Sequence, residues 1–178
     1  EHRMTDKIEI IVYVDLNDFN QTNIGSEEIV YSESGETKII GNKMLVYFDG
    51  DHLKLREKVK EGIASVYFSS MFFGNNIQEI VQNAVLLDLP LWFKSGFIAY
   101  ASSPWDIQIE DELRDALAKD KKYYNFKKLA AKHPRVAGHS LWYFLRLNYG
   151  RSAISNLLYL TRISRNLDKS IEFTLNTS

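Results

Sequence analysis

The sequence predicts an α+β protein in which a small, mostly antiparallel N-terminal sheet is followed by a helical body. Short segments rich in β-branched residues fill positions 1–50, and from residue 51 onward apolar residues recur at helical spacing. The chain has 178 residues, 45% of them hydrophobic, which is enough for one domain with a sizeable core. We therefore expect a single domain, 1–178, with a sheet region over 1–50 and a helical region over 51–178.

Four segments of the sheet region have strand-like composition. The first, residues 8–14 (IEIIVYV), is short and rich in β-branched side chains, which favours a buried strand. Asp15 then offers a cap for a short helix. The other strands are expected over 28–32, 37–40 and 43–48, with turns at Ser34-Gly35 and Gly41-Asn42.

A long helix is expected to begin after Asp51 and to end at Gly74. Its apolar residues follow three- and four-residue steps or multiples of them, which predicts one buried face: Leu55, Val59, Ile63, Val66 and Phe73. Gly62 interrupts the middle of this helix at a cost of about 1 kcal/mol relative to alanine. Either close packing at that glycine or the general burial of the helix would account for it.

The remaining chain is expected to be helical. Pro90 suits the first turn of a helix over 91–102, and Gly150 should end the helix that begins at Arg135. In the segment 105–119, apolar residues are expected to face inward and carboxylates outward. The residues expected to face inward in this segment are Ile107, Ile109, Leu113, Ala116 and Leu117. Those expected to be buried in the helix that begins at Arg135 are Leu141, Trp142, Phe144, Leu145 and Tyr149. Further helices are expected over 77–87, 153–163 and 167–175.

Composition narrows the classes of partner. The net charge of −1 argues against nucleic acid, although the segment 119–135 carries seven basic residues and one acid among three aromatic residues. We expect this segment to be solvated. The absence of cysteine excludes disulfides and cysteine-ligated metals, and no apolar run is long enough for a transmembrane segment. The chain opens on Glu1 rather than methionine, so we expect a piece of a longer protein.

Two phrases in the middle of the chain resemble the zinc-binding helices of a peptidase. Residues 92–100 read WFKSGFIAY, and residues 60–66 read KEGIASV. Zinc peptidases of this type carry His-Glu-x-x-His on the first helix and a ligating Glu on the second. The resemblance places Glu61 and Ser65 at the histidine positions, Gly62 at the catalytic Glu and Ser95 at the third ligand.

The resemblance extends over nearly the whole chain. The segments 89–93 and 137–143, and the pair Tyr149-Gly150, are similar to the peptidase-MA-like (gluzincin-type, zincin-like) domain. The stretch through Met71, Gly74 and 83–87 resembles TolB-like envelope proteins of Bacteroidetes, in which this domain precedes a β-propeller. The resemblance implies a periplasmic or cell-envelope location.

The metal-binding chemistry of that family is missing from the sequence. No two of the four histidines are four residues apart: His2, His52, His133 and His139. Shifting the register by one residue leaves Lys60 and Ala64 at the histidine positions, and neither can ligate zinc. We therefore expect no metal, no cofactor and no catalysis. The resemblance implies a catalytically inactive peptidase-like domain that serves as a protein-interaction or structural module with a protein partner.

Two other functions remain open. One is a hydrolase built on a different constellation, such as Glu61 with Tyr100. The other is a glycan- or peptide-binding domain that reuses the inherited cleft, lined by Trp92, Tyr100 or Trp105. Ser65 and Ser95 would lie near each other if the helices pair as in the family, but neither has an obvious base. His139 is expected to be a packed, hydrogen-bonded residue, and the aromatic residues of 67–73 are expected to be mostly core.

Overall fold

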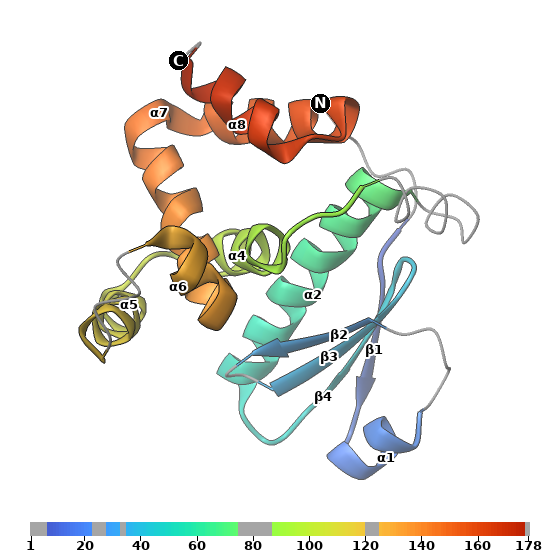
Figure 1. Ribbon diagram of the computed structural model, residues 1–178. Helices are drawn as coiled ribbons and strands as arrows, with labels where there is room; N and C mark the ends of the chain where they lie inside the picture. The colour runs from blue at the N-terminus through green and yellow to red at the C-terminus, as the bar shows by residue number, and fades with distance from the viewer. Residues whose placement is uncertain (1–6, 23–27, 33–34, 75–86, 120–124, 177–178) are drawn as a thin grey trace. The chain divides into compact units, whose positions relative to one another are not determined.

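The computed structural model describes residues 7–22, 28–32, 35–74, 87–119 and 125–176. The chain divides into two compact units, 1–84 and 85–178 (Figure 1). The first unit contains a four-stranded sheet with two helices, and the described elements of the second are all helical. The predicted α+β class, with a small sheet followed by helices, is confirmed. The prediction of one domain and the zincin-like relationship stay predictions.

The sheet of the first unit has the strand order β1-β4-β3-β2. Its strands are β1 (Glu9–Tyr13), β2 (Glu28–Ser32), β3 (Gly35–Ile40) and β4 (Lys43–Tyr47). The β2–β3 and β3–β4 pairs are antiparallel and the β1–β4 pair is parallel, so the prediction of a mostly antiparallel sheet is confirmed. The predicted turn at Gly41-Asn42 is present, whereas Ser34 lies outside the described residues.

The prediction that the first strand is buried is wrong. β1 is an edge strand of the sheet (Figure 1). The side chains of Ile10, Ile11 and Val12 are all exposed. The long helix α2 packs on β2, β3 and β4. A β-branched composition indicates a strand but carries no information about which neighbours cover it.

The other face of the sheet holds α1 (Leu16–Gln21), whose first turn is capped by Asp15 as predicted. The Asp15 carboxylate accepts hydrogen bonds from the backbone N–H groups of Asn17 and Asp18, at 2.8 and 2.9 Å. The ring of Phe19 is fully buried, with its centroid 5.1 Å from that of Tyr47 and 6.1 Å from that of Tyr13. This contact joins α1 to β1 and β4.

Helix α2 (His52–Phe73) begins and ends where the sequence predicts. Asp51 caps its first turn, and Gly74 follows its end with a φ of 92°. The predicted buried face is wrong in part, because Ile63 is exposed while Lys58 and Ser65 are buried.

Gly62 explains the choice of face. A Cβ at Gly62 would collide with Sδ of Met44 on β4 and would lie 3.2 Å from Cγ2 of Thr37 on β3. The predicted close packing is therefore confirmed. The helix turns its glycine towards the sheet, and this orientation decides which neighbouring side chains become buried.

The second unit contains α4 (Leu91–Ser102), α5 (Ile107–Lys119), α6 (Phe126–Lys132), α7 (Pro134–Ser164) and α8 (Leu167–Asn176). Helices α4 and α7 lie in backbone contact (Figure 1). A Cβ at Gly96 would collide with the backbone of Gly138, and one at Gly138 would collide with the carbonyl oxygen of Trp92. Trp142 Nε1 donates a hydrogen bond to the carbonyl of Phe93 at 3.1 Å, which ties the same two helices together.

Most helix ends of the second unit agree with the sequence prediction. Gly150, with a φ of 80°, breaks the helical conformation within α7. Pro90 is the N-cap of α4 rather than a residue of its first turn. Ile107 and Phe144 were expected to be buried but are exposed, because the buried side of α5 lies further along the helix at Ala116 and that of α7 includes Trp142 and Leu145. The helix expected over 77–87 lies outside the described residues except for its last position, Leu87, which is not helical.

Within the described ranges, no helix is both long and apolar enough to cross a lipid bilayer.

Candidate functional site

The four positions that the resemblance assigns to zinc chemistry divide between the two units. Glu61, Gly62 and Ser65 are buried on α2. Ser65 Oγ has no hydrogen-bond partner among the described residues. Ser95 is on α4, where its hydroxyl donates a hydrogen bond to the carbonyl of Leu91 at 2.8 Å. The predicted proximity of Ser65 and Ser95 joins two units and stays a prediction.

These four residues do not fit a zinc ion. A catalytic zinc site in a protein needs three nitrogen, sulfur or carboxylate ligands, whereas the positions supply one carboxylate, one glycine and two hydroxyls. In the described part of the chain, no group of three or more His, Asp or Glu side chains could hold a metal ion. The described histidines stand apart in the sequence, at the start of α2 (His52), before α7 (His133) and within α7 (His139).

His139 is packed among aromatic rings, as predicted. Its ring lies edge-on to Trp105, with centroids 5.2 Å apart, and 6.3 Å from the ring of Tyr100. Burial lowers the pKa of His139 to about 4, and the charge of Arg135 acts in the same direction against the weaker effect of Asp106. Nε2 of His139 has no hydrogen-bond partner among the described residues, so the packing predicted for this residue is confirmed but the predicted hydrogen bond is not found at this atom. The imidazole is therefore neutral at physiological pH.

Two of the three aromatic residues proposed to line a cleft gather around His139. Trp105 stacks on Tyr143 with centroids 5.0 Å apart and an interplanar angle of 8°. Tyr100 lies 6.4 Å from the ring of Trp142. Both residues are only partly buried, so this cluster forms part of the surface of the second unit.

Trp92 belongs to a different cluster. Its ring meets Phe126 edge-on at 5.1 Å and packs against the core formed by α5, α6 and α7. The buried members of that core are Ala116, Leu129, Ala130 and Ala137. Trp92 therefore contributes to the packing of that core, whereas Tyr100 and Trp105 both contact the ring of His139.

Sequence reasoning missed a buried lysine beside the sheet. Lys58 on α2 is fully buried, and its ammonium group donates a hydrogen bond to the carbonyl of Tyr47 at 3.1 Å. Nζ also lies 3.5 Å from the centroid of the Tyr47 ring and 3.6 Å from Oδ2 of Asp49. Burial lowers the pKa of Lys58, although the carboxylate of Asp49 opposes this effect. A lysine in a helix is usually solvated, so only its position one turn before Gly62 hints at burial.

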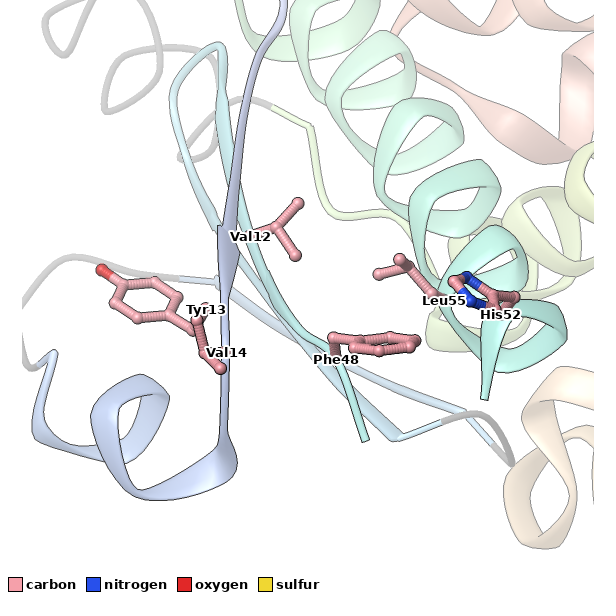
Figure 2. Close-up of a pocket in the computed structure, with 6 residues that line it drawn as sticks. All are labelled: Val12, Tyr13, Val14, Phe48, His52 and Leu55. Atoms are coloured by element: carbon pink, nitrogen blue, oxygen red, sulfur yellow. The ribbon is translucent and has the colours of Figure 1, made fainter. Parts of the chain in front are cut away.

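An open apolar groove runs between β1 and the start of α2. Its volume is about 270 Å³, and it is lined by Val12, Tyr13, Val14, Phe48, His52 and Leu55. Figure 2 shows Val12 and Leu55 pointing towards one another, while the ring of Tyr13 points to the opposite side of β1. The rings of Phe48 and His52 are 4.8 Å apart at one end of the groove.

The backbone of β1 directs N–H and C=O groups next to this groove that no described strand pairs. Glu9 donates its N–H to the carbonyl of Asn42 at 3.0 Å, and Phe48 donates its N–H to the carbonyl of Tyr13 at 2.9 Å. Alternate residues of a parallel strand bond to the same neighbour, so Ile10 and Val12 direct their N–H and C=O groups to the other edge. No described strand pairs with that edge. We call this edge and the groove together the β1 surface.

The β1 surface was missed because the sequence does not specify strand order. One signal was available: residues 8–14 are apolar on both faces, a pattern that fits a strand covered on both sides. β1 has much of that pattern, but α2 packs on β2, β3 and β4, and the side chains of Ile10, Ile11 and Val12 stay exposed.

Comparisons of the chain with models of protein families, with characterised proteins and with solved structures found no match. The peptidase-MA-like relationship therefore stays a prediction that rests on the two sequence phrases and the segments around them.

Proposed function

We propose that this chain is a protein-interaction module that binds its partner through the β1 surface. The observation that carries the proposal is the exposure of four apolar side chains on and beside one edge strand. Ile10, Ile11, Val12 and Val14 have exposed fractions of 44, 40, 49 and 82%. Folded proteins usually protect an edge of this kind with charges, proline or a covering segment, because it can pair with another chain.

The β1 surface has the two components that strand addition requires. An added strand gains affinity from main-chain hydrogen bonds and specificity from side chains that enter pockets at alternate positions. Ile10 and Val12 supply the outward N–H and C=O groups. The side chain of Val12 faces the groove with Leu55 and Phe48, which would receive alternate side chains of the added strand (Figure 2).

The proposal includes the loss of peptidase chemistry. In support of it, Gly62 is used for packing against Met44, the Ser95 hydroxyl is bonded to a carbonyl of its own helix, and Glu61 lies on a buried helix face. We place the module in the periplasm or cell envelope, and the resemblance to envelope proteins is the sole support for that location.

A peptide-display selection tests the proposed function. We expect the chain to select extended peptides with alternating apolar residues, and Val12→Glu to weaken their binding at least tenfold, because a carboxylate would enter the apolar groove. Ile163→Glu is the matched control, since Ile163 is also an exposed aliphatic residue but lies on α7. Peptides that bind equally well to the wild type and to Val12→Glu would contradict the proposal.

A further inference from the structure

We propose that the partner of β1 is a second copy of this chain, paired antiparallel through the two β1 strands with Ile11 at the two-fold axis. This inference rests on the proposed function, because it uses the same surface and names the occupant. The two four-stranded sheets would then continue as one sheet in the order β2-β3-β4-β1-β1-β4-β3-β2.

The hydrogen-bonding pattern of β1 restricts the possible registers. In an antiparallel pair, residues whose N–H and C=O groups point at the partner must face one another as hydrogen-bonded pairs. The outward residues of β1 are Ile10 and Val12, since Glu9, Ile11 and Tyr13 bond to β4. A two-fold axis at Ile11 places Ile10 opposite the partner's Val12 and Val12 opposite the partner's Ile10. All four outward groups of each strand are then paired.

Charge complementarity selects this register among those that the backbone permits. With Ile11 at the axis, Lys7 lies opposite the partner's Asp15, and Ile8 lies opposite the partner's Val14. Opposite charges facing one another across a strand pair are favourable, and like charges are unfavourable. Moving the axis to Val12 would place Glu9 opposite the partner's Asp15, and moving it to Ile10 would leave Lys7 opposite the partner's Tyr13.

Asp15 can take part without losing its structural role. Both of its capping bonds to α1 use Oδ1, so pairing with the partner's Lys7 requires only Oδ2. The exposed apolar side chains of the two copies also contact one another in this register. Ile10 and Val12 of both copies lie on the groove side of the joined sheet, while the two Ile11 side chains meet on the other side.

The interface that β1 offers is small. One strand from each copy buries less than the roughly 800 Å² per partner that is typical of stable complexes. We therefore expect a reversible equilibrium between monomer and dimer rather than a permanent dimer.

Cysteine scanning tests the register directly, because the chain has no cysteine of its own. At the axis, the two Ile11 residues form a non-hydrogen-bonded pair with Cα atoms about 4.5 Å apart, within the range of a disulfide. Two Ile10 or two Val12 residues would be separated by more than about 7 Å, which a disulfide cannot span. Under mild oxidation we expect Ile11→Cys to cross-link at least about tenfold faster than Ile10→Cys or Val12→Cys. Equal rates, or a faster rate at position 10 or 12, would overturn the inference.

Sedimentation velocity provides a second measurement. We expect the wild-type chain to show a concentration-dependent dimer and Val12→Pro to remain monomeric. Proline removes the outward N–H of Val12 and leaves the bonds between β1 and β4 in place. The far-UV circular dichroism of Val12→Pro should match that of the wild type, which shows that the variant is folded. If the spectra differ, the variant is set aside and the cross-linking rates of the cysteine variants decide whether the inference holds.

The two proposals fail in different ways. A wild-type chain that stays monomeric at high concentration and selects groove-dependent peptides would overturn the second-copy inference and leave the proposed function standing. A monomeric chain without such peptides would overturn both. Preferential cross-linking at position 11 would support both.

Discussion

Gly138→Ala tests the closest helix contact in the second unit. A Cβ at Gly138 would collide with the carbonyl oxygen of Trp92 and would lie 2.7 Å from Cα of Gly96. Both neighbours are backbone atoms, so no side chain can rotate away and α4 must move from α7. Overpacking of this kind costs about 3 kcal/mol at the upper end of the usual range, and the better helix propensity of alanine returns about 1 kcal/mol. We expect the free energy of unfolding to fall by about 2 kcal/mol.

Urea denaturation followed by tryptophan fluorescence measures this change, because Trp92 and Trp142 lie at the contact. Trp142 should also lose its hydrogen bond to Phe93 as the helices separate, which adds to the loss of stability. Ser155→Ala is the matched control on α7, since Ser155 is exposed and its replacement should change stability by less than about 0.5 kcal/mol. A Gly138→Ala variant as stable as the control would refute the backbone contact.

Three further predictions concern the buried polar residues and the positions that the resemblance assigns to zinc. Lys58→Met should change the free energy of unfolding by less than about 1 kcal/mol at pH 7, because the lost hydrogen bond is offset by no longer burying a charge. Lys58→Ala should lower it by about 2–4 kcal/mol, because the shorter side chain leaves a cavity. Burial lowers the pKa of Lys58, so at alkaline pH the unfolded chain binds more protons at this residue than the folded chain. The free energy of unfolding of the wild type should therefore rise relative to that of Lys58→Met as pH rises towards 10.5. The opposite trend in urea titrations would contradict the burial of Lys58. The pKa of His139 is about 4 when folded and 6.5 when unfolded, so stability should fall as pH falls from 6.5 to 4, by about 3 kcal/mol in total, and His139→Phe should remove that fall. The chain should bind no stoichiometric zinc by elemental analysis, because the positions that the resemblance assigns to zinc supply no imidazole; one tightly bound equivalent would contradict the proposed loss of peptidase chemistry.

The ends of most described elements could be predicted from the sequence because they depend on local chemistry. Asp15 and Asp51 accept backbone hydrogen bonds at the helix starts, and Gly74 and Gly150 adopt positive φ where the helical conformation stops. These interactions involve residues within one turn of each other, so a single sequence contains the necessary information.

The buried faces depend on contacts between distant residues, and there prediction was less successful. The apolar spacing of α2 pointed to Ile63, but the close approach of Gly62 to Met44 turns a partly polar face towards the sheet. The exposure of β1 depends on its place at the end of the strand order, which residues 8–14 do not encode. The same reason explains why the β1 surface could not be predicted from the sequence.

Gly62 connects the fold of the first unit to the proposed loss of peptidase chemistry. The resemblance assigns this position to the water-activating glutamate of a zinc peptidase. In this chain the same position packs directly against β4, and a Cβ there would collide with Sδ of Met44. A glutamate at position 62 would therefore displace the buried side chain of Met44 from its place between α2 and β4, so we expect Gly62→Glu to lower the free energy of unfolding in urea denaturation.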